Sequence, residues 1–361
     1  MDFGFTPEQE MLRDAARKFL ATASPPSVAR AAMASTDAHD PARWRALAKL
    51  GWLGILVPAD LEGQGGDFLD MAVVLEESGK ALLPGPFFAS AVLATLALRD
   101  AGSAAQRTRL LPALARGERV ATLARGVSGD AAVTLRTDGR VTGRVPFVMD
   151  AASADLLVVV ARRESGAPAL ALVERTAAGV GVLPLATVDM TRRLAALELH
   201  DVAAEELTAA EPDAVLRRLG DHACAGLALE LVGVGQRALE LSVAYAGERM
   251  QFGRPIGSFQ AVKHRCVDMM VQVETARSLA YYAAWAVAEA ADDATRAAAM
   301  AKAYAGEMAK TVTSDAIQVH GGIGFTWEHD LHLYYRRALA ADAAFGAAPA
   351  HRETIVAPLV R

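Results

Sequence analysis

The spacing of apolar residues changes twice along the chain, and these changes predict three regions. In residues 1–117, apolar side chains recur at intervals of three and four, the period of a helix with one buried face. Residues 118–207 alternate with a period of two, which is typical of β-strands. Residues 208–361 return to the helical period in longer segments. We therefore predict a mainly α chain with a β insert: an N-terminal helical domain, a middle β-sheet or barrel domain and a C-terminal four-helix bundle.

The first region carries its own helix-start signals. Thr6 can cap a helix, Pro7 suits its first turn, and the acidic Glu8 and Glu10 favour its positive end. A glycine-rich loop at residues 62–67 lacks the Gly-Lys-Ser/Thr ending of a phosphate-binding loop. Further helices are predicted at Pro41–Leu50, Phe68–Ala81, Pro86–Ala101 and Ala104–Ala115.

The middle region contains short segments that alternate or are continuously apolar. Thr137-Asp138-Gly139 predicts a hairpin turn with glycine where a positive φ is needed. The run from Asp155 to Arg162 is apolar enough to be a strand buried on both faces. Strands are predicted at Ala131–Arg136, Arg140–Met149, Ala154–Ala161, Ala169–Val173 and Leu194–Leu199.

The third region predicts long helices joined by two turns. The helices are expected at Asp213–Glu248, Ser258–Ala291 and Asp292–His320, with Ser258 as the cap of the second. After the third, a further helix is expected to begin near Thr326. Long helices with apolar faces favour a bundle.

Composition narrows the function classes. The net charge of −5 and the lack of a Lys/Arg run argue against a nucleic-acid surface. The two cysteines, Cys224 and Cys266, are expected to be free buried thiols, and no spacing suggests a metal site. No apolar run is long enough to cross a bilayer, and the N-terminus does not have the pattern of a signal peptide. We expect a cytoplasmic protein.

The turn between the first two long helices carries candidate binding residues. Arg249 can pair with a phosphate through two hydrogen bonds, and Phe252 can pack on a planar ring. Gln260 lies in the first turn of the next helix and can reach a base edge or a ribose. The alternative is a polar interhelical loop, with Pro255 and Gly257 as its turn residues.

A second candidate is the glycine cluster from Gln318 to Gly324. Here a long helix ends in a run of glycines, which lets backbone N–H groups approach an anion closely. A helix-breaking turn is the alternative for this segment.

Together, the two segments resemble the acyl-CoA dehydrogenase family. The first is Arg-x-x-Phe-Gly-x-x-Ile-x-x-x-Gln and the second Gln-x-x-Gly-Gly-x-Gly-Phe, and the similarity covers nearly the whole chain, including Trp52–Pro58. The resemblance implies FAD bound at a subunit interface. The family's FAD contacts would be, on one subunit, Arg249, Phe252, Ile256 and Gln260, and on its neighbour Gln318, Gly321, Gly322 and Gly324.

The resemblance also implies α,β-dehydrogenation of an acyl-CoA thioester, with a glutamate as the base that removes the α-proton. Family members keep that glutamate at either of two places. In this chain those places hold Phe345 and Ala223, so both are empty of a base. The family's flavin-contacting segment in the sheet domain also survives only in altered form, at Leu123–Asp130.

Three residues are substitutes for the base, each with a plainer interpretation. Glu230, two helical turns beyond Ala223, and Asp342, about one turn before Phe345, are expected to be solvated or capped carboxylates. His320 is expected to be a helix C-terminal cation or a packing residue.

Three hypotheses follow. The first is an FAD-dependent subunit of a hetero-oligomer whose homologous partner supplies the glutamate. Residues 145–150 and 345–352 resemble a subset of the family that forms α2β2 heterotetramers and acts on steroid side-chain CoA thioesters. The second is a homo-oligomer, such as a homotetramer, with an atypical base. The third is a non-catalytic scaffold. For the enzymes, the resemblance implies an electron-transfer flavoprotein as acceptor.

Overall fold

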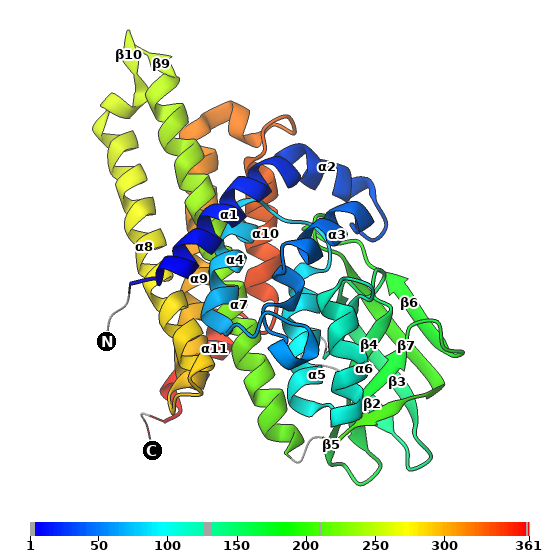
Figure 1. Ribbon diagram of the computed structural model, residues 1–361. Helices are drawn as coiled ribbons and strands as arrows, with labels where there is room; N and C mark the ends of the chain where they lie inside the picture. Colours follow the sequence, from blue (N-terminus) through cyan, green and yellow to red (C-terminus); the bar gives the residue numbers. More distant parts are fainter. Residues whose placement is uncertain (1–3, 126–131, 209–210, 359, 361) are drawn as a thin grey trace. The chain divides into compact units, whose positions relative to one another are not determined.

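The computed structural model describes residues 4–125, 132–208, 211–358 and 360. Along the chain, helices come before and after a middle group of β-strands (Figure 1). The predicted fold class, helical regions before and after a β region, is confirmed. The chain divides into two compact units. The first unit comprises Met1–Ser27, Ala72–Leu83 and Cys224–Arg361, and the second comprises Val28–Met71 and Pro84–Ala223.

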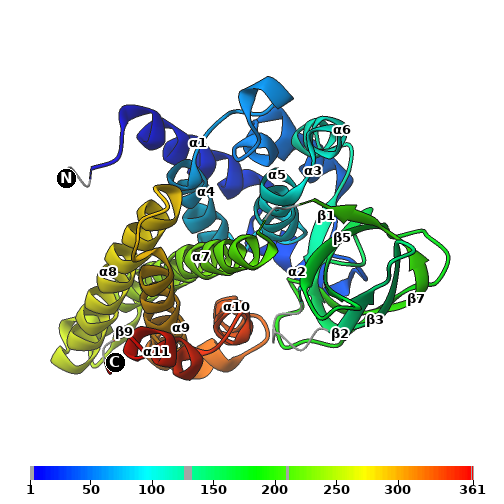
Figure 2. The same ribbon diagram turned by 90° about the horizontal axis from the view of Figure 1, so that it is seen from below.

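The second unit is built on a curled sheet, which Figure 2 shows end-on. Its strand order is β6-β7-β3-β2-β4-β5-β8, and β1 pairs with β4 in parallel. Helices of this unit are α3 (Pro41–Lys49), α5 (Thr95–Ala101) and α6 (Ala104–Ala115). The strands are β1 (Ala121–Ala124), β2 (Ala132–Leu135), β3 (Arg140–Met149), β4 (Leu156–Arg163), β5 (Pro168–Glu174), β6 (Val180–Pro184), β7 (Leu194–Ala203) and β8 (Glu205–Leu207).

The sheet confirms the strongest strand predictions. β4 is buried from Leu156 to Val159, as the continuous apolar run predicted. Gly139 has φ +77° between β2 and β3, as the hairpin turn required. The strands β1, β6 and β8 were not predicted. β6 has no buried position and β8 has three residues, so neither carries a clear alternating pattern.

The helix predicted at Pro86–Ala101 has two parts. A π-helix covers Phe88–Ala94, and α5 follows it. The Thr95 hydroxyl donates to the carbonyl of Ser90, five residues earlier, at 2.9 Å, which suits the wider π turn. The Ser90 hydroxyl in turn accepts a hydrogen bond from the backbone N–H of Ala121 in β1, at 3.1 Å.

The first unit is helical. A capping box starts α1: the Thr6 hydroxyl accepts from the N–H of Gln9, and the Gln9 side chain accepts from the N–H of Thr6, each at 3.2 Å. Thr6 is thus confirmed as a cap. Two helices cross the boundary to the second unit near their start, α4 (Phe68–Lys80) and α7 (Pro212–Glu248), and α2 (Pro26–Ala34) crosses it as well. The remaining helices are α1 (Pro7–Ala23), α8 (Gln260–Ala288), α9 (Ala294–His320), α10 (Leu331–Ala343) and α11 (Ala348–Val356).

Two helix-start predictions were wrong. Ser258 does not cap α8, because its hydroxyl donates to the carbonyl of Pro255 and the helix begins after Phe259. Thr326 does not begin α10, because its hydroxyl donates to the carbonyl of Ile323 in the preceding 3-10 turn. In both places a hydroxyl that could cap the following helix bonds backward instead, a competition that sequence spacing does not resolve.

Helices α4 and α7 touch through glycines. A Cβ added to Gly79 would lie 2.0 Å from the carbonyl oxygen of Glu230, and one added to Gly233 would lie 2.0 Å from that of Glu76. Backbone therefore packs directly on backbone here, which no larger residue permits. This contact fixes where the middle of α7 lies within the first unit.

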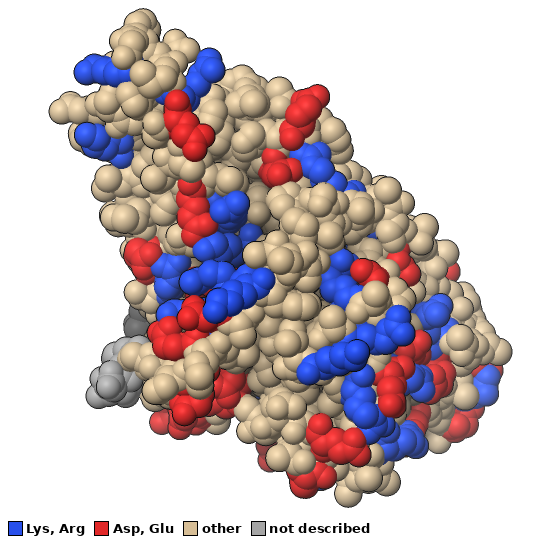
Figure 3. All heavy atoms as spheres, turned by 45° about the horizontal axis from the view of Figure 1, so that its top comes forward, with Lys and Arg blue, Asp and Glu red and all other residues tan. Residues whose placement is uncertain are grey.

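Charged side chains of both signs share the surface. On the face drawn in Figure 3, acidic and basic side chains lie next to one another rather than in separate fields. Many of them are paired in the structure, such as Arg136 with Asp201 at 3.1 Å. Among the described residues, no helix is both long enough and apolar enough to cross a membrane.

Candidate functional site

The turn that contains Arg249 is a short β-hairpin between α7 and α8. β9 (Met250–Gln251) pairs with β10 (Arg254–Pro255), and Phe252 and Gly253 form its tip with φ +51° and +75°. Two backbone bonds close its base: the N–H of Arg249 donates to Tyr245, and the N–H of Ile256 donates to Arg249, each at 2.8 Å. A positive φ for a bulky residue such as phenylalanine is uncommon and strained.

The hairpin presents its side chains to solvent. Phe252 is 91% exposed, Arg249 and Gln260 are also exposed, and Ile256 is partly buried. No carboxylate in the described part of the chain forms an ion pair with the Arg249 guanidinium. Arg254 differs, because its guanidinium stacks 4.2 Å from the ring centroid of Phe259. Arg249 therefore has its hydrogen-bond donors available to a phosphate.

The glycine segment follows directly from α9. Gly321 has φ +62° and ψ −138°, a conformation open to glycine and costly for other residues. A Cβ added to Gly321 or Gly322 would meet nothing within 4 Å, whereas one added to Gly324 would lie 2.7 Å from the carbonyl oxygen of Ile317. The chain's own packing thus requires Gly324, and its backbone requires Gly321. Neither packing nor backbone conformation requires a glycine at position 322. The missing side chain at Gly322 leaves room for an outside group to approach the backbone.

A stacked pair of rings joins the two segments. The His320 ring, at the end of α9, stacks on Tyr245 in α7 with centroids 4.4 Å apart. Tyr245 lies one turn before Arg249, so the arginine turn and the glycine segment begin from adjoining helix ends. His320 is buried, its Nδ1 lies 2.8 Å from the carbonyl oxygen of Ala316, and burial lowers its pKa. Of the two interpretations left open, the packing residue is confirmed.

Burial of histidines predicts a loss of stability in mild acid. The unfolded chain takes up protons near pH 6.5, while the folded state resists them, so the stability contributed is full above that pH and declines as pH falls below it. We expect the urea midpoint of unfolding to be lower at pH 5.5 than at 7.5. The change of this midpoint with pH should be smaller in His320→Gln than in the wild type. An equal change with pH in that variant would show that His320 is not involved. Burial is the first cause of a lowered pKa at His39, His222, His320 and His351.

Buried side chains hold the turn that carries Phe345 through hydrogen bonds to its backbone. Phe345 has φ +57° and Gly346 has φ +99°. The Lys302 ammonium donates to the carbonyl oxygens of Asp342 at 2.8 Å and Gly346 at 3.0 Å, and His351 Nε2 lies 3.0 Å from the same Gly346 oxygen. Lys302 is fully buried, and burial lowers its pKa to about 8. A charged side chain is thus buried to hold this turn in shape.

The two places expected for a base hold residues without a titratable group. Ala223 is buried in α7, and the next residue, Cys224, has its Sγ 3.9 Å from the carbonyl oxygen of Phe345. Neither Ala223 nor Phe345 can accept a proton. Cys224 is a buried thiol outside any disulfide, as predicted, whereas Cys266 is only partly buried.

The two substitute carboxylates were expected to be solvated or capped, and the solvated alternative was wrong, because both are buried. Asp342 is buried, and its Oδ2 accepts from Lys310 Nζ at 2.6 Å. Glu230 is only 3% exposed. Their own helices suggested exposure, but burial comes from other helices packed over them. Lys302 was missed for the same reason, although a lysine on a face of α9 otherwise lined by alanines is a usable signal.

Only the first part of the altered segment Leu123–Asp130 lies within the described residues. Leu123 and Ala124 are buried in β1, and Arg125 Nη1 donates to the carbonyl of Leu216 at 2.9 Å. The rest of that segment, residues 126–130, lies outside the described residues. Within the described residues, no cluster of three or more His, Cys, Asp or Glu side chains could hold a metal ion.

Along the chain, helical regions precede and follow a curled sheet, and within the first unit an arginine-bearing hairpin and a glycine-lined helix end begin from adjoining helices. The comparison with family models identifies the family. The acyl-CoA dehydrogenase N-terminal domain matches residues 6–118 and the acyl-CoA dehydrogenase C-terminal domain matches residues 214–359. The chain belongs to the acyl-CoA dehydrogenase family.

One relative by sequence and two solved structures are similar to nearly the whole chain. The chain is 36% identical to acyl-CoA dehydrogenase IpdE2 of Mycolicibacterium smegmatis over 340 residues, 94% of each chain. It is similar to a chain in the ChsE4–ChsE5 complex from Mycobacterium tuberculosis, with 31% identity, a TM-score of 0.92, and 100% and 99% of the two chains covered. A variant of the Tcur3481–Tcur3483 steroid ACAD gives 30% identity and a TM-score of 0.89, with 98% of each chain covered.

Proposed function

We propose that this chain is an FAD-dependent acyl-CoA dehydrogenase subunit that lacks the catalytic base and works with a homologous partner that supplies it. One observation carries the proposal: the turn expected to bear the base is built and braced, yet it presents Phe345. Burying the Lys302 charge under this turn costs free energy, which its hydrogen bonds to the carbonyl oxygens of Asp342 and Gly346 help to offset.

The residues at the two exposed segments fit the cofactor. Arg249 can pair with a phosphate oxygen, and the backbone of Gly321 and Gly322 is open to an anion. Gln260 and Gln318 are exposed amides that can donate to and accept from polar cofactor groups. When bound, the flavin would supply the acceptor for the hydride that leaves the β-carbon of the thioester. The chain's own contribution would be to bind and orient that group.

The exposed aromatic residues support a site completed by another subunit. Phe252 is 91% exposed and Phe325 is 80% exposed, and Trp327, two residues further along, is 54% exposed. Apolar rings at such exposure beside a binding segment are typical of an interaction surface. The names of the ChsE4–ChsE5 and Tcur3481–Tcur3483 neighbours each join two components, which supports a hetero-oligomer over a homotetramer. The α2β2 form is part of the proposal.

The substrate is proposed from the same neighbours. One is described as a steroid ACAD, so we infer a CoA thioester with a bulky steroid-derived acyl group. An electron-transfer flavoprotein is the proposed electron acceptor. Two carboxylates are candidates for an atypical base: Asp342 is engaged by Lys310 Nζ at 2.6 Å, whereas Glu230 is buried, which by itself suits a base. We propose the hetero-oligomer rather than the homo-oligomer with its own base because of the two-component neighbours.

Co-expression with a homologous, glutamate-bearing dehydrogenase subunit tests the proposal. We expect the pair to co-purify with flavin and to dehydrogenate acyl-CoA. The chain alone, or the pair with the partner's glutamate changed to glutamine, should be 10²–10⁴-fold slower, roughly the contribution of a general base. The readouts are the flavin absorbance spectrum and reduction of an artificial electron acceptor.

Two results would contradict it. If the chain alone forms a flavin-loaded homotetramer as active as the pair, it carries its own base. If no assembly contains flavin, a non-catalytic scaffold of the same fold is the better explanation.

A further inference from the structure

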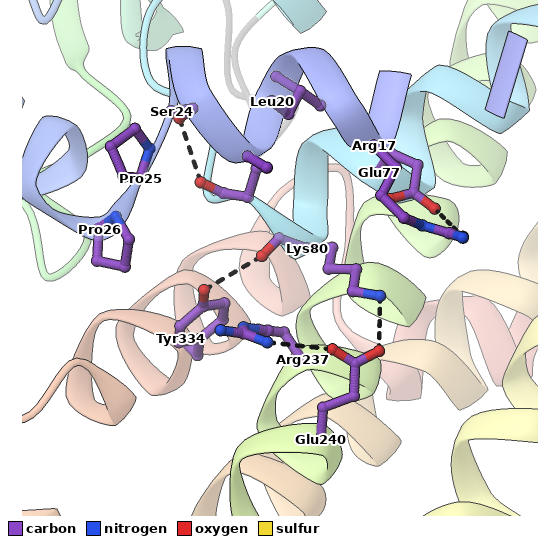
Figure 4. A pocket seen from close by; sticks show the side chains of 12 residues that line it. Arg17, Leu20, Ser24, Pro25, Pro26, Glu77, Lys80, Arg237, Glu240 and Tyr334 are labelled. Atoms are coloured by element: carbon purple, nitrogen blue, oxygen red, sulfur yellow. Dashed lines mark hydrogen bonds and ion pairs between the residues drawn. The ribbon is translucent and has the colours of Figure 1, made fainter. Parts of the chain in front are cut away.

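A cavity of about 350 Å³ lies inside the first unit, lined by α1, α4, α7, α10 and the Pro25-Pro26 link after α1 (Figure 4). Its volume is at the lower end of the range for small-molecule sites. None of its residues belongs to the arginine turn, the glycine segment or the Phe345 turn. It is therefore separate from the site proposed for the cofactor.

The lining has two distinct sides. Figure 4 shows Lys80, Arg237, Glu240 and Tyr334 gathered on one side, with Leu20 and the two prolines across from them. The apolar lining residues are Leu20, Ala21, Pro25, Pro26 and Ala81, and Figure 4 shows Ser24, Arg17 and Glu77 on the same side as Leu20. A ligand that fits both sides has an apolar body and a polar head.

The carboxylates of the cavity are already neutralised. Glu240 accepts from Lys80 Nζ at 2.6 Å and Arg237 Nη1 at 3.3 Å. Burial disfavours its ionised form, but hydrogen bonds from Lys80, Gln236 and Arg237 outweigh burial and lower its pKa. Glu77 is buried and pairs with Arg17 at 2.8 Å. Both carboxylates are thus engaged by cationic side chains.

The cations outnumber the anions. On the polar side two cationic side chains, Lys80 and Arg237, share one carboxylate, Glu240, so one positive charge is in excess there. Arg17 is matched separately, by Glu77 at 2.8 Å and by Asp14, outside the lining, at 3.8 Å. Tyr334 does not cancel it, because burial raises its pKa to about 12 and its hydroxyl donates to the Lys80 carbonyl at 3.1 Å. A guanidinium has five N–H donors, of which Arg237 gives one nitrogen to Glu240 and a further contact to the Tyr334 hydroxyl. Arg237 thus retains donors for a carboxylate.

We propose that this cavity binds a small organic acid, a monocarboxylate with a short apolar body. Its carboxylate lies against Arg237 and Lys80, and its body packs on Leu20 and the two prolines. One excess positive charge matches one carboxylate, and the two glutamates disfavour a more highly charged anion. A neutral alcohol of the same length leaves the excess charge unmatched.

Ligand-observed NMR titration of the full chain tests this, with hexanoate as the probe and 1-hexanol and inorganic phosphate as comparisons. We expect hexanoate to bind at least tenfold more tightly than either comparison. Arg237→Gln should raise the Kd of hexanoate at least tenfold, the scale of one charge-assisted hydrogen bond. Ala21→Phe should raise it similarly, because Ala21 lines the cavity and is exposed, so the larger ring fills the space.

Matched controls locate the binding. Arg296→Gln removes an exposed arginine that pairs with Asp293, and Met11→Phe adds a ring elsewhere on α1, and neither should change the Kd. Equal binding of hexanoate and hexanol, or no hexanoate binding, would overturn the proposal. So would an unchanged Kd in both Arg237→Gln and Ala21→Phe, because hexanoate would then occupy another site. Turnover is not measured, so failure of this test leaves the proposed dehydrogenase function standing.

Discussion

Arg249→Ala is expected to lower the affinity of the assembled protein for FAD by roughly 10- to 100-fold, the scale of a lost charge-assisted contact with a phosphate. The Arg249 side chain is exposed and pairs with no carboxylate of the described chain, so the fold should be unaffected. Flavin released on denaturation, and FAD titration into the flavin-free protein, measure the change. Arg249→Lys should retain part of the affinity, because it keeps the charge but not the two-pronged geometry.

The matched control lies in the same hairpin. Arg254 stacks on Phe259 in its own chain, so Arg254→Ala should alter flavin affinity much less than Arg249→Ala. If Arg249→Ala and wild type bind equal amounts of flavin, Arg249 is only a polar residue of an interhelical turn. That outcome would withdraw the cofactor assignment for this half of the site.

Gly79→Ala is expected to destabilise the protein by about 3 kcal/mol or more, since a new Cβ would lie 2.0 Å from a backbone oxygen of α7. Backbone cannot rotate away as a side chain can, so α4 must move off α7. Gly233→Ala should behave alike, because its Cβ would meet the Glu76 carbonyl oxygen at 2.0 Å. Urea unfolding followed by circular dichroism measures the effect.

Gly247→Ala is the control for helix propensity. Gly247 also lies in α7, and an added Cβ there meets nothing within 4 Å. Removing a helical glycine at an open position should stabilise by about 0.5–1 kcal/mol. If Gly79→Ala were as stable as Gly247→Ala, the close contact between α4 and α7 would be wrong.

Local signals predicted the elements whose causes are local. The capping box at Thr6, the apolar run of β4 and the hairpin at Gly139 each depend on residues within a few positions, and each was confirmed. The predictions at Ser258 and Thr326 failed, because each hydroxyl had a backbone acceptor three residues earlier. Local chemistry allowed both outcomes there.

Burial of charged groups was not predictable from any single helix. The pattern of its own helix predicted a solvated or capped Asp342. In the structure the Asp342 carboxylate accepts a hydrogen bond from Lys310, which lies far away in the chain. Lys302 lies among alanines and bonds to one carbonyl oxygen in the last turn of α10 and to another just after that helix. These contacts join positions separated by tens of residues, and no short-range period encodes them.

The sequence by itself determined the order of helical and β regions, the two glycine- and arginine-bearing segments and the missing glutamate, because each follows from residue type and local spacing. Only the tertiary structure decided that these two segments begin from adjoining helix ends, that the Phe345 turn is braced by Lys302, and that a charged cavity lies between α1 and α7. Those features arise from packing between distant segments. Such packing depends on shape and desolvation in three dimensions, which the period of apolar residues does not record.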